Sequence, residues 1–393
     1  MNPFRPMPRT SLPPSAPGRC PAGGGPGDAG CISLNRPDEA GIPALPSGEA
    51  LRLPRLRTVR LLLIVLLAVL PVGCDVLSGD DTPGADADLR FPVRLDGRWG
   101  FINASGRIVI APQFEAAGDF ADGLAPVQVG GLWGYVDAGG TLVVPPTYRV
   151  ATPFAEERAA VRNEAGYGFI DPTGAVVVEP QYELARPFAE GLAAVRLDGR
   201  WGYIDRRGAV VVEPRYSDAR DFADGLAAVE SPDGWLYIDR SGAVAIDPGF
   251  AIEAAGDFAD GLAPFATSDG WGYLNRQGQP AISPRFEAAG PFADGLAPAA
   301  EDGYWGFIDR RGAFVIPPQF REARPFAEAM APVRLNNRWT FVDQRSRRVA
   351  LARHFLLAEP FRHGLARIYN GNADDPDIGY IDHQGAYVWY PTR

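Results

Sequence analysis

The sequence predicts an all-β protein in which tandem three-stranded antiparallel meanders stack into an open, curved β-solenoid. Two observations predict this fold. A Trp-Gly pair recurs every 34 residues over most of the chain, which is typical of a repeat protein. Within each repeat, short β-branched and aromatic segments alternate with turn residues. The 46 Gly and 38 Pro residues favour regular turns over long helices.

The composition limits the classes of function. The 393 residues include 38 basic residues, all of them Arg, and 48 acidic residues, so the net charge is −10. An acidic chain lacks the basic face that binds phosphates, and we therefore expect no nucleic-acid partner. Three Cys are too few for a disulfide framework, and three His leave little material for a metal or catalytic site. We expect no cofactor and no bound metal.

The residues before the repeats divide into three segments. Residues 1–50 are rich in Pro and Gly without a hydrophobic period, so we predict that they are disordered or a wrongly assigned N-terminal extension. Residues 51–73 have the features of a signal peptide, because four Arg precede the apolar run Leu61–Leu70, which is too short to span a bilayer. Residues 74–88 contain five Asp and are expected to form an acidic tether.

Cys74 follows the apolar run after Pro71-Val72-Gly73, and this arrangement resembles a bacterial lipoprotein signal. Pro71 stands where such signals usually have Leu. The resemblance implies that Cys74 carries a lipid and attaches the protein to a membrane. We therefore expect a lipid-anchored, extracytoplasmic protein of the bacterial cell envelope, with a secreted or periplasmic protein as the alternative. A plain signal peptide or a short membrane anchor remains possible for residues 51–73.

Nine repeats account for residues 89–393. Successive markers are 34 residues apart, except for one step of 36 and a last step of 39 residues. A second marker, Phe-Ala-Asp-Gly-Leu at residues 120–124, recurs in step with the first. The repeated Trp position holds Trp99, Trp133, Tyr167, Trp201, Trp235, Trp271, Trp305, Trp339 and Ile378.

The repeat at residues 192–225 predicts three strands and one loop. Apolar, aromatic and β-branched residues mark the strands, while Asp-Gly is a strong hairpin signal. Pro214 cannot donate to a ladder and is expected to end the third strand. The expected strands are residues 192–197, 201–205 and 209–213, and residues 215–225 are expected to connect to the next repeat.

A four-residue turn follows the central strand of each repeat, as at Asp205–Gly208. Type I turns favour Asp or Asn at the first position and Gly at the fourth, which matches the pattern. A calcium site is the alternative, but it needs several oxygen ligands around one point. Each repeat offers a single Asp, which the turn already uses, so we predict turns.

The repeated aromatic position also allows two interpretations. The side chains either pack in the core, or form an exposed ladder that stacks on sugars or bases. Ile378 fills a core but cannot act as a stacking platform. We therefore predict a structural role for the eight aromatic residues from Trp99 to Trp339.

The combination of these repeating motifs resembles the bacterial WG-repeat family over residues 89–393. The resemblance implies tandem β-repeats, often behind a secretion or lipoprotein signal, and it brings no shared catalytic residues. Three strands per repeat, nine units and uneven steps favour the open solenoid, with a propeller-like ring as the alternative. The longer insert Asn370–Asp377 is expected to mark a C-terminal cap.

These features predict a non-catalytic, envelope-tethered scaffold that binds a protein or a glycan through an extended surface. Passive spacing or an assembly role is one alternative. A glycan hydrolase is another, for which the non-repeated residues are the only candidates. Those are Asp374, Asp375 and Asp377 beside His363 and His383. Candidate partner-binding residues are Arg206, Arg207, Arg310 and Arg311, which are equally compatible with solvated surface charge.

Overall fold

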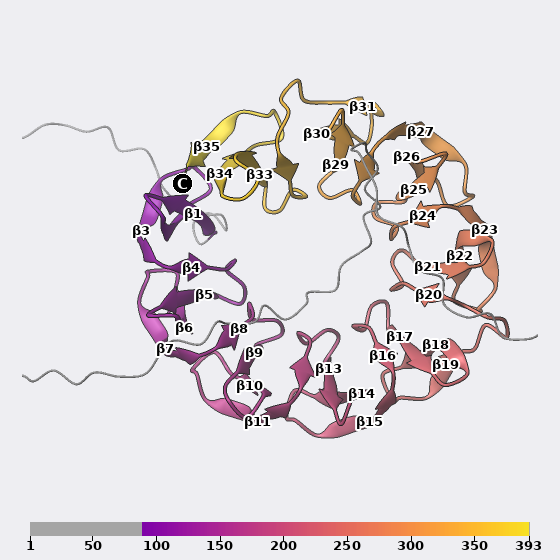
Figure 1. Cartoon of the computed structure of the whole chain (residues 1–393), viewed down its shortest axis with the longest axis horizontal. Coiled ribbons are helices and arrows are strands. Elements are labelled where there is room, and N and C mark those ends of the chain that lie inside the picture. The colour runs from indigo at the N-terminus through magenta and orange to yellow at the C-terminus, as the bar shows by residue number, and fades with distance from the viewer. Residues whose placement is uncertain (1–88, 393) are drawn as a thin grey trace, which may run out of the picture. The chain divides into compact units, whose positions relative to one another are not determined.

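The computed structural model describes residues 89–392, which fold into nine antiparallel β-sheets arranged in a closed ring (Figure 1). Eight sheets have four strands and the first has three. The fold is a nine-bladed β-propeller, and each sheet is one blade, numbered 1 to 9 in chain order. The predictions for residues 1–50, 51–73 and 74–88, including Cys74, lie outside the described residues. Residues 89–392 contain no helix of the length and apolarity needed to cross a membrane.

Each strand has a fixed place between the centre and the rim of the ring (Figure 1). The innermost strands have two residues each and are β4 Ala116–Ala117, β8 Val150–Ala151, β12 Leu184–Ala185, β16 Asp218–Ala219, β20 Ala254–Ala255, β24 Ala288–Ala289, β28 Glu322–Ala323 and β32 Leu357–Ala358. The second strands are β1 Phe91–Leu95, β5 Leu124–Val129, β9 Ala159–Arg162, β13 Leu192–Leu197, β17 Leu226–Ser231, β21 Leu262–Thr267, β25 Ala297–Glu301, β29 Met330–Leu335 and β33 Ala366–Gly371.

The other two strands of each blade lie further out. The third strands are β2 Arg98–Ile102, β6 Leu132–Asp137, β10 Tyr167–Ile170, β14 Arg200–Asp205, β18 Gly234–Asp239, β22 Gly270–Asn275, β26 Tyr304–Ile308, β30 Arg338–Asp343 and β34 Pro376–Ile381. The outermost strands are β3 Ile108–Phe114, β7 Leu142–Tyr148, β11 Val176–Tyr182, β15 Val210–Tyr216, β19 Val244–Ile246, β23 Pro280–Phe286, β27 Phe314–Phe320, β31 Arg348–Val349 and β35 Tyr387–Thr392.

Blade 4 shows why the sequence forms these strands. Asp198 and Gly199 have φ values of 49° and 71°, the positive pair that a tight hairpin needs between β13 and β14. Pro214 does not end the outermost strand, as the sequence predicted, but lies inside β15. The register shifts between the pairs Tyr203↔Val212 and Trp201↔Tyr216, so β15 bulges there. A proline fits because an outermost strand has a free edge.

The predicted open solenoid is wrong, because the repeats close into a ring. The prediction counted three strands per repeat and treated residues 215–225 as a loop. The equivalent connector one repeat earlier, which leads into blade 4, contains the strand β12. Leu184 of β12 pairs with Arg196 of β13. Two residues are too short to show the alternation that marks a strand. The uneven steps do not open the ring, since the extra residues lie in the loop after β19 and mainly in the β33–β34 hairpin.

The core consists of contacts between neighbouring blades. The ring of Phe222, from the turn between β16 and β17, packs edge-on against Tyr203 of the preceding blade at 5.0 Å. The Tyr203 hydroxyl donates a hydrogen bond of 2.7 Å to the Arg220 carbonyl. Equivalent aromatic pairs recur around the ring, each stabilising by about 1 kcal/mol beyond its buried area. Each blade is therefore stabilised mainly by the blades that precede and follow it in the sequence.

The closing junction, between blade 9 and blade 1, is built differently. Blade 1 has no innermost strand among residues 89–392. The hydroxyl groups of Tyr380 and Thr392 donate to the carbonyls of Pro92 and Arg94, at 2.9 and 2.6 Å. In blade 4 the innermost segment donates to the equivalent carbonyls through backbone N–H groups. Side-chain hydroxyls of blade 9 therefore make the hydrogen bonds to β1 that an innermost segment makes in the other blades.

Arg367 also belongs to the closing junction. It stands on β33 where all eight other blades carry Ala or Pro, and its guanidinium pairs with Asp119 of blade 2. The Tyr380 hydroxyl lies 2.8 Å from Arg367 Nε. Burial lowers the pKa of Arg367, but Tyr380, Asp119 and Glu359 raise it above its ordinary value. Arg367 therefore links the two blades on either side of blade 1.

The insert Asn370–Asp377 does not form a cap, because it belongs to the β33–β34 hairpin of blade 9. Asp375 in this hairpin pairs with Arg94 of blade 1. The insert therefore contributes to closing the ring.

Candidate functional site

The repeated Asp turns are structural, as the sequence predicted. The Asp205 carboxylate accepts hydrogen bonds of 2.9 Å from the N–H groups of Arg207 and Ala209. Equivalent bonds from the residue four positions on occur in eight of the nine blades, and in blade 8 the Asp343 carboxylate accepts the Ser346 N–H instead. A hydrogen bond from Thr173 holds the pKa of Asp171 below its usual value, and Ser241 does the same for Asp239. In residues 89–392, no group of three or more His, Cys, Asp or Glu side chains could hold a metal ion.

The residues proposed for a hydrolase site are not brought together. Asp374 and Asp375 lie in the β33–β34 hairpin, whereas His363 and His383 lie in turns at the other end of these strands. The His383 ring stacks on Phe361 at a centroid distance of 4.1 Å. Asp375 instead pairs with Arg94 of blade 1, away from the two His side chains.

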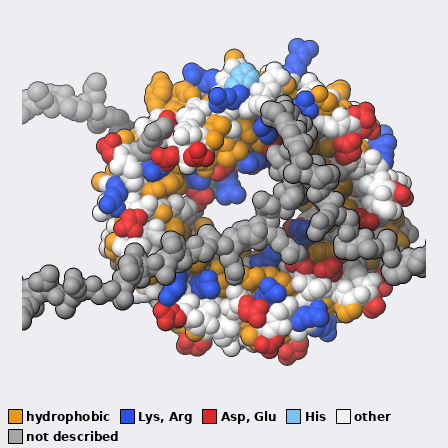
Figure 2. Space-filling view, viewed as in Figure 1, with side chains coloured by type: hydrophobic (Ala, Val, Ile, Leu, Met, Phe, Trp, Pro, Cys, Tyr) orange, Lys and Arg blue, Asp and Glu red, His pale blue; other side chains and the backbone are white. Residues whose placement is uncertain are grey.

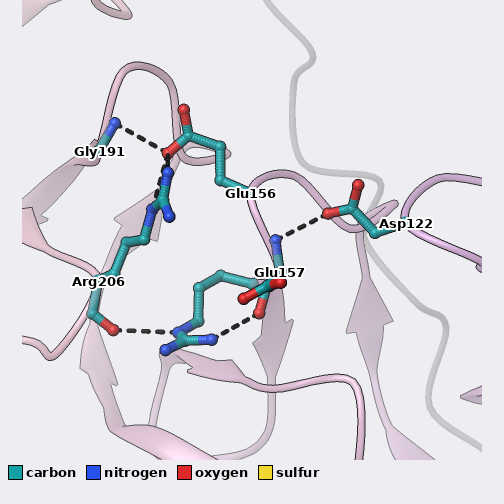
Figure 3. Close-up of polar contacts among 6 residues, drawn as sticks. Asp122, Glu156, Glu157, Gly191 and Arg206 are labelled. Carbon is teal, nitrogen blue, oxygen red and sulfur yellow. Dashed lines mark hydrogen bonds and ion pairs between the residues drawn. The ribbon is translucent and has the colours of Figure 1, made fainter.

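A second row of carboxylates joins neighbouring blades. The turn after each innermost strand, which we call the inner turn, carries an Asp or Glu in blades 2 to 8, whereas blade 9 has His363 at this position. In six blades this carboxylate accepts a backbone N–H from the inner turn of the next blade, as Glu156 does from Gly191 at 2.8 Å (Figure 3). The other pairs, at 2.7–3.0 Å, are Asp122 with Glu157, Glu190 with Gly225, Asp224 with Gly261, Asp260 with Gly295 and Glu328 with Gly364.

Arg206, a predicted partner-binding residue, is part of such a junction. Its guanidinium lies 2.8 Å from the Glu156 carboxylate, and its carbonyl accepts a bond of 3.0 Å from Arg158 (Figure 3). Arg207, Arg310 and Arg311 are exposed. Of the four predicted residues, Arg206 therefore has a clear inter-blade contact.

The repeated aromatic residues lie within the blades. Trp201 and Trp339 are buried, and the other six are half-buried. Arginine side chains cover some of these rings, as Arg186 covers Trp201 at 5.4 Å and Arg324 covers Trp339 at 4.8 Å. None of the eight rings from Trp99 to Trp339 belongs to an exposed ladder.

Arg186, Arg220, Asp221 and Asp257 form a charged cluster that the sequence did not reveal. In blades 4, 5 and 6, Arg186 and Arg220 directly follow an innermost strand, and Asp221 and Asp257 are the second residue after one. Asp221 Oδ1 and Asp257 Oδ1 are buried and accept no hydrogen bond from the described residues. Burial raises the pKa of both carboxyls, against the opposing effect of the nearby arginines. The repeats conceal this cluster, because the position of Asp221 and Asp257 holds Pro in most blades.

An exposed aromatic patch lies on the outside of blade 9. We call Arg353, Tyr387 and Tyr390 the aromatic patch. The two Tyr rings stack at 4.8 Å, and the Arg353 guanidinium lies 4.6 Å from the centre of the Tyr387 ring. Tyr390 is 71% exposed, more than any other large hydrophobic residue among residues 89–392. Acidic and basic side chains are otherwise interspersed on the visible face of the ring (Figure 2). The sequence did not predict the aromatic patch, because none of its three residues belongs to a repeated motif.

Comparisons with known proteins concern the repeat and the fold. A sequence profile described as "WG containing repeat" matches residues 99–133, 133–165, 167–201, 201–234, 271–305 and 305–339. A search of curated proteins finds no match. The segment around Trp235-Leu236, in which Leu replaces the Gly, lies between the matched segments.

Two of the solved structures that the chain matches differ in how closely they resemble it. One, described as a eukaryotic initiation factor, has a TM-score of 0.57 and 14% identity, over 76% of this chain and 94% of that chain. Another, the dihydro-heme d1 dehydrogenase NirN, has a TM-score of 0.45 and 13% identity, over 81% of this chain and 76% of that chain. Only the first is similar enough to bear on the fold, and at this identity it says nothing about activity.

Proposed function

The chain belongs to the family of WG-containing repeat proteins, and from this premise we propose that it is a non-catalytic scaffold that binds a protein or a glycan in the bacterial cell envelope. The repeated residues are used to build turns, junctions and the core. Residues outside the repeat pattern are therefore the candidates for binding a partner.

The aromatic patch is the observation that carries this proposal. Tyr and Arg are enriched where proteins bind one another, and exposed aromatic rings also stack on sugars. The stacked Tyr387 and Tyr390 are preorganised, so little side-chain entropy is lost when a partner binds. Arg353 adds hydrogen-bond donors beside the rings.

Cross-linking in cells tests the patch. A photoreactive phenylalanine replaces Tyr390, and the matched control replaces Val210, which is 48% exposed on the outermost strand of blade 4. We expect an adduct with one envelope protein or glycan at position 390, and its loss when Arg353→Ala is added without a change in the thermal midpoint. No adduct, or the same adducts at both positions, would contradict the proposal.

The envelope location has its own test. Cells are labelled with a lipid precursor, and the wild type is compared with Cys74→Ala. Label on the wild type alone supports lipid attachment at Cys74, whereas label on neither protein contradicts it. Deleting one repeat is a poor test of binding against passive spacing, because every blade of a closed ring also holds its two neighbours.

A further inference from the structure

A pocket of about 510 Å³ lies where blades 9, 1 and 2 meet. Its walls combine apolar and polar groups. The residues that matter here are Leu89, Arg90, Phe91, Phe120, Gly123 and His363. Ala121, Asp122 and Ala138 complete the part of the wall that belongs to blade 2.

The junction between blades 3 and 4 shows what this kind of site binds (Figure 3). Arg158 donates to the carbonyls of Arg206 and Glu157, at 3.0 and 2.7 Å. Beside it, the Glu156 carboxylate accepts a bond from the Gly191 N–H and pairs with Arg206. A carboxylate is therefore held between a backbone N–H and an arginine.

The same geometry recurs two repeats earlier in the chain. Arg90 donates to the carbonyls of Ala138 and Leu89, at 3.2 and 3.1 Å, as Arg158 does in the other junction. Gly123 stands at the repeat position of Gly191. Within residues 89–392, no carboxylate accepts the Gly123 N–H. Ala138 replaces Arg206, and the smaller side chain leaves room for a larger group.

We propose that this pocket is a carboxylate-binding site. The Gly123 N–H donates to the carboxylate, and Arg90 and His363 supply further polar groups. Leu89, Phe91 and Phe120 contact an apolar body attached to the carboxylate. The Asp122 carboxylate is turned away, because it accepts the Glu157 N–H at 2.7 Å. The site is separate from the aromatic patch and does not depend on the proposed function.

The carboxylate has two possible sources, and one substitution separates them. Asp88 precedes the described residues in the chain and has the repeat position of Glu156. The other source is a free ligand or a partner molecule. Ala138→Arg restores the arginine of the other junction, which strengthens binding of an Asp88 side chain but fills the space needed by a larger ligand.

The first arm measures thermal midpoints of the full chain. If Asp88 is the source, Ala138→Arg raises the midpoint, and the rise disappears when Asp88→Asn is added. Asp80→Asn is the matched control, since it removes a charge from the same acidic stretch and should leave the rise intact.

The second arm titrates the full chain with N-acetylphenylalanine and with its amide. If a ligand is the source, the acid binds about tenfold more tightly than the amide, and Ala138→Arg abolishes the difference. The site is supported if the rise in the thermal midpoint depends on Asp88. It is also supported if the chain prefers N-acetylphenylalanine to its amide and Ala138→Arg removes this preference. If neither is found in correctly folded variants, the proposal is overturned.

Discussion

At the scale of single residues, the glycine of the Trp-Gly pair allows the outermost strand to approach the third strand. A Cβ on Gly202 would lie 2.4 Å from the Val212 carbonyl oxygen and 2.7 Å from Pro214 N. Two blades carry a larger residue at this position, Leu236 and Thr340, and their outermost strands have three and two residues. With Gly202, β15 has seven residues. A side chain at the position of Gly202 is therefore incompatible with an outermost strand of full length.

Gly202→Ala tests this explanation. The added Cβ meets backbone atoms that cannot rotate away, so we expect a loss of about 1–3 kcal/mol in the free energy of unfolding. Hydrogen exchange should also become faster along β15. Urea denaturation measures the first effect, and mass spectrometry the second.

Gly139→Ala is the control, because Gly139 has no strained φ and its Cβ would meet only the Asp137 side chain at 3.3 Å. We expect a change within about 0.5 kcal/mol. Equal stability of both variants would show that the close approach does not explain the glycine.

At the scale of elements, the Asp turns and the segments that follow the innermost strands place carboxyls in opposite environments. Hydrogen bonds lower the pKa of Asp239 in its turn, so this group stabilises the fold above the unfolded pKa of about 3.9. That contribution is lost as the pH falls through the folded pKa. Burial raises the pKa of Asp257, so its charged form destabilises the fold at neutral pH. That penalty is relieved as the pH falls through the raised pKa towards the unfolded value.

Asp239→Ala and Asp257→Asn should therefore respond to pH in opposite directions. At pH 7 we expect Asp239→Ala to lower the thermal midpoint and Asp257→Asn to raise it. As the pH falls, the difference for Asp257→Asn should shrink first, through the raised pKa of Asp257. The difference for Asp239→Ala should shrink only at lower pH, below the unfolded pKa of about 3.9. Thermal melts between pH 3 and 8 measure the differences, and the exposed hairpin variant Asp233→Asn is the control. A lower midpoint for Asp257→Asn at pH 7 would refute the argument.

At the scale of the whole molecule, closure depends on a few side chains that the other junctions lack. Eight junctions join blades that follow one another in sequence. The closing junction joins residues such as Tyr380 and Pro92, which are 288 positions apart. Blade 1 contributes no innermost strand to it among residues 89–392. The ion pair between Arg367 and Asp119 connects blade 9 to blade 2, the two neighbours of blade 1.

Arg367→Ala places at this position the residue that several other blades carry. We expect a loss of about 2 kcal/mol, because Asp119 and Tyr380 lose a charged partner. Hydrogen exchange should rise in β1 and β34 before other strands. In a double-mutant cycle, Asp119→Ala should add little once Arg367 is gone.

Arg334→Ala is the matched control for closure. Arg334 pairs with Glu322 inside blade 8, and both side chains are partly exposed. We expect a loss below about 1 kcal/mol and no change in β1. Equal effects of the two arginine substitutions would show that Arg367 has no special role in closing the ring.

The sequence predicted the repeat, the hairpins and the Asp turns, because each depends on residues adjacent in the chain. It missed the innermost strands, since two residues such as Leu184-Ala185 carry no period. It also missed closure, because Arg367 and Asp119 are 248 positions apart and neither stands out alone. The aromatic patch escaped detection because Tyr387 and Tyr390 become neighbours of Arg353 only in the folded protein.

The side-chain closure has a consequence for the order of assembly. Contacts between consecutive blades are local in sequence and form quickly, whereas contacts across the closing junction need the whole chain. No strand has to wait for a distant partner before its own sheet is complete. We therefore expect folding to proceed blade by blade through an open ribbon, with closure as the last kinetic step and opening of the closing junction as the first step of unfolding.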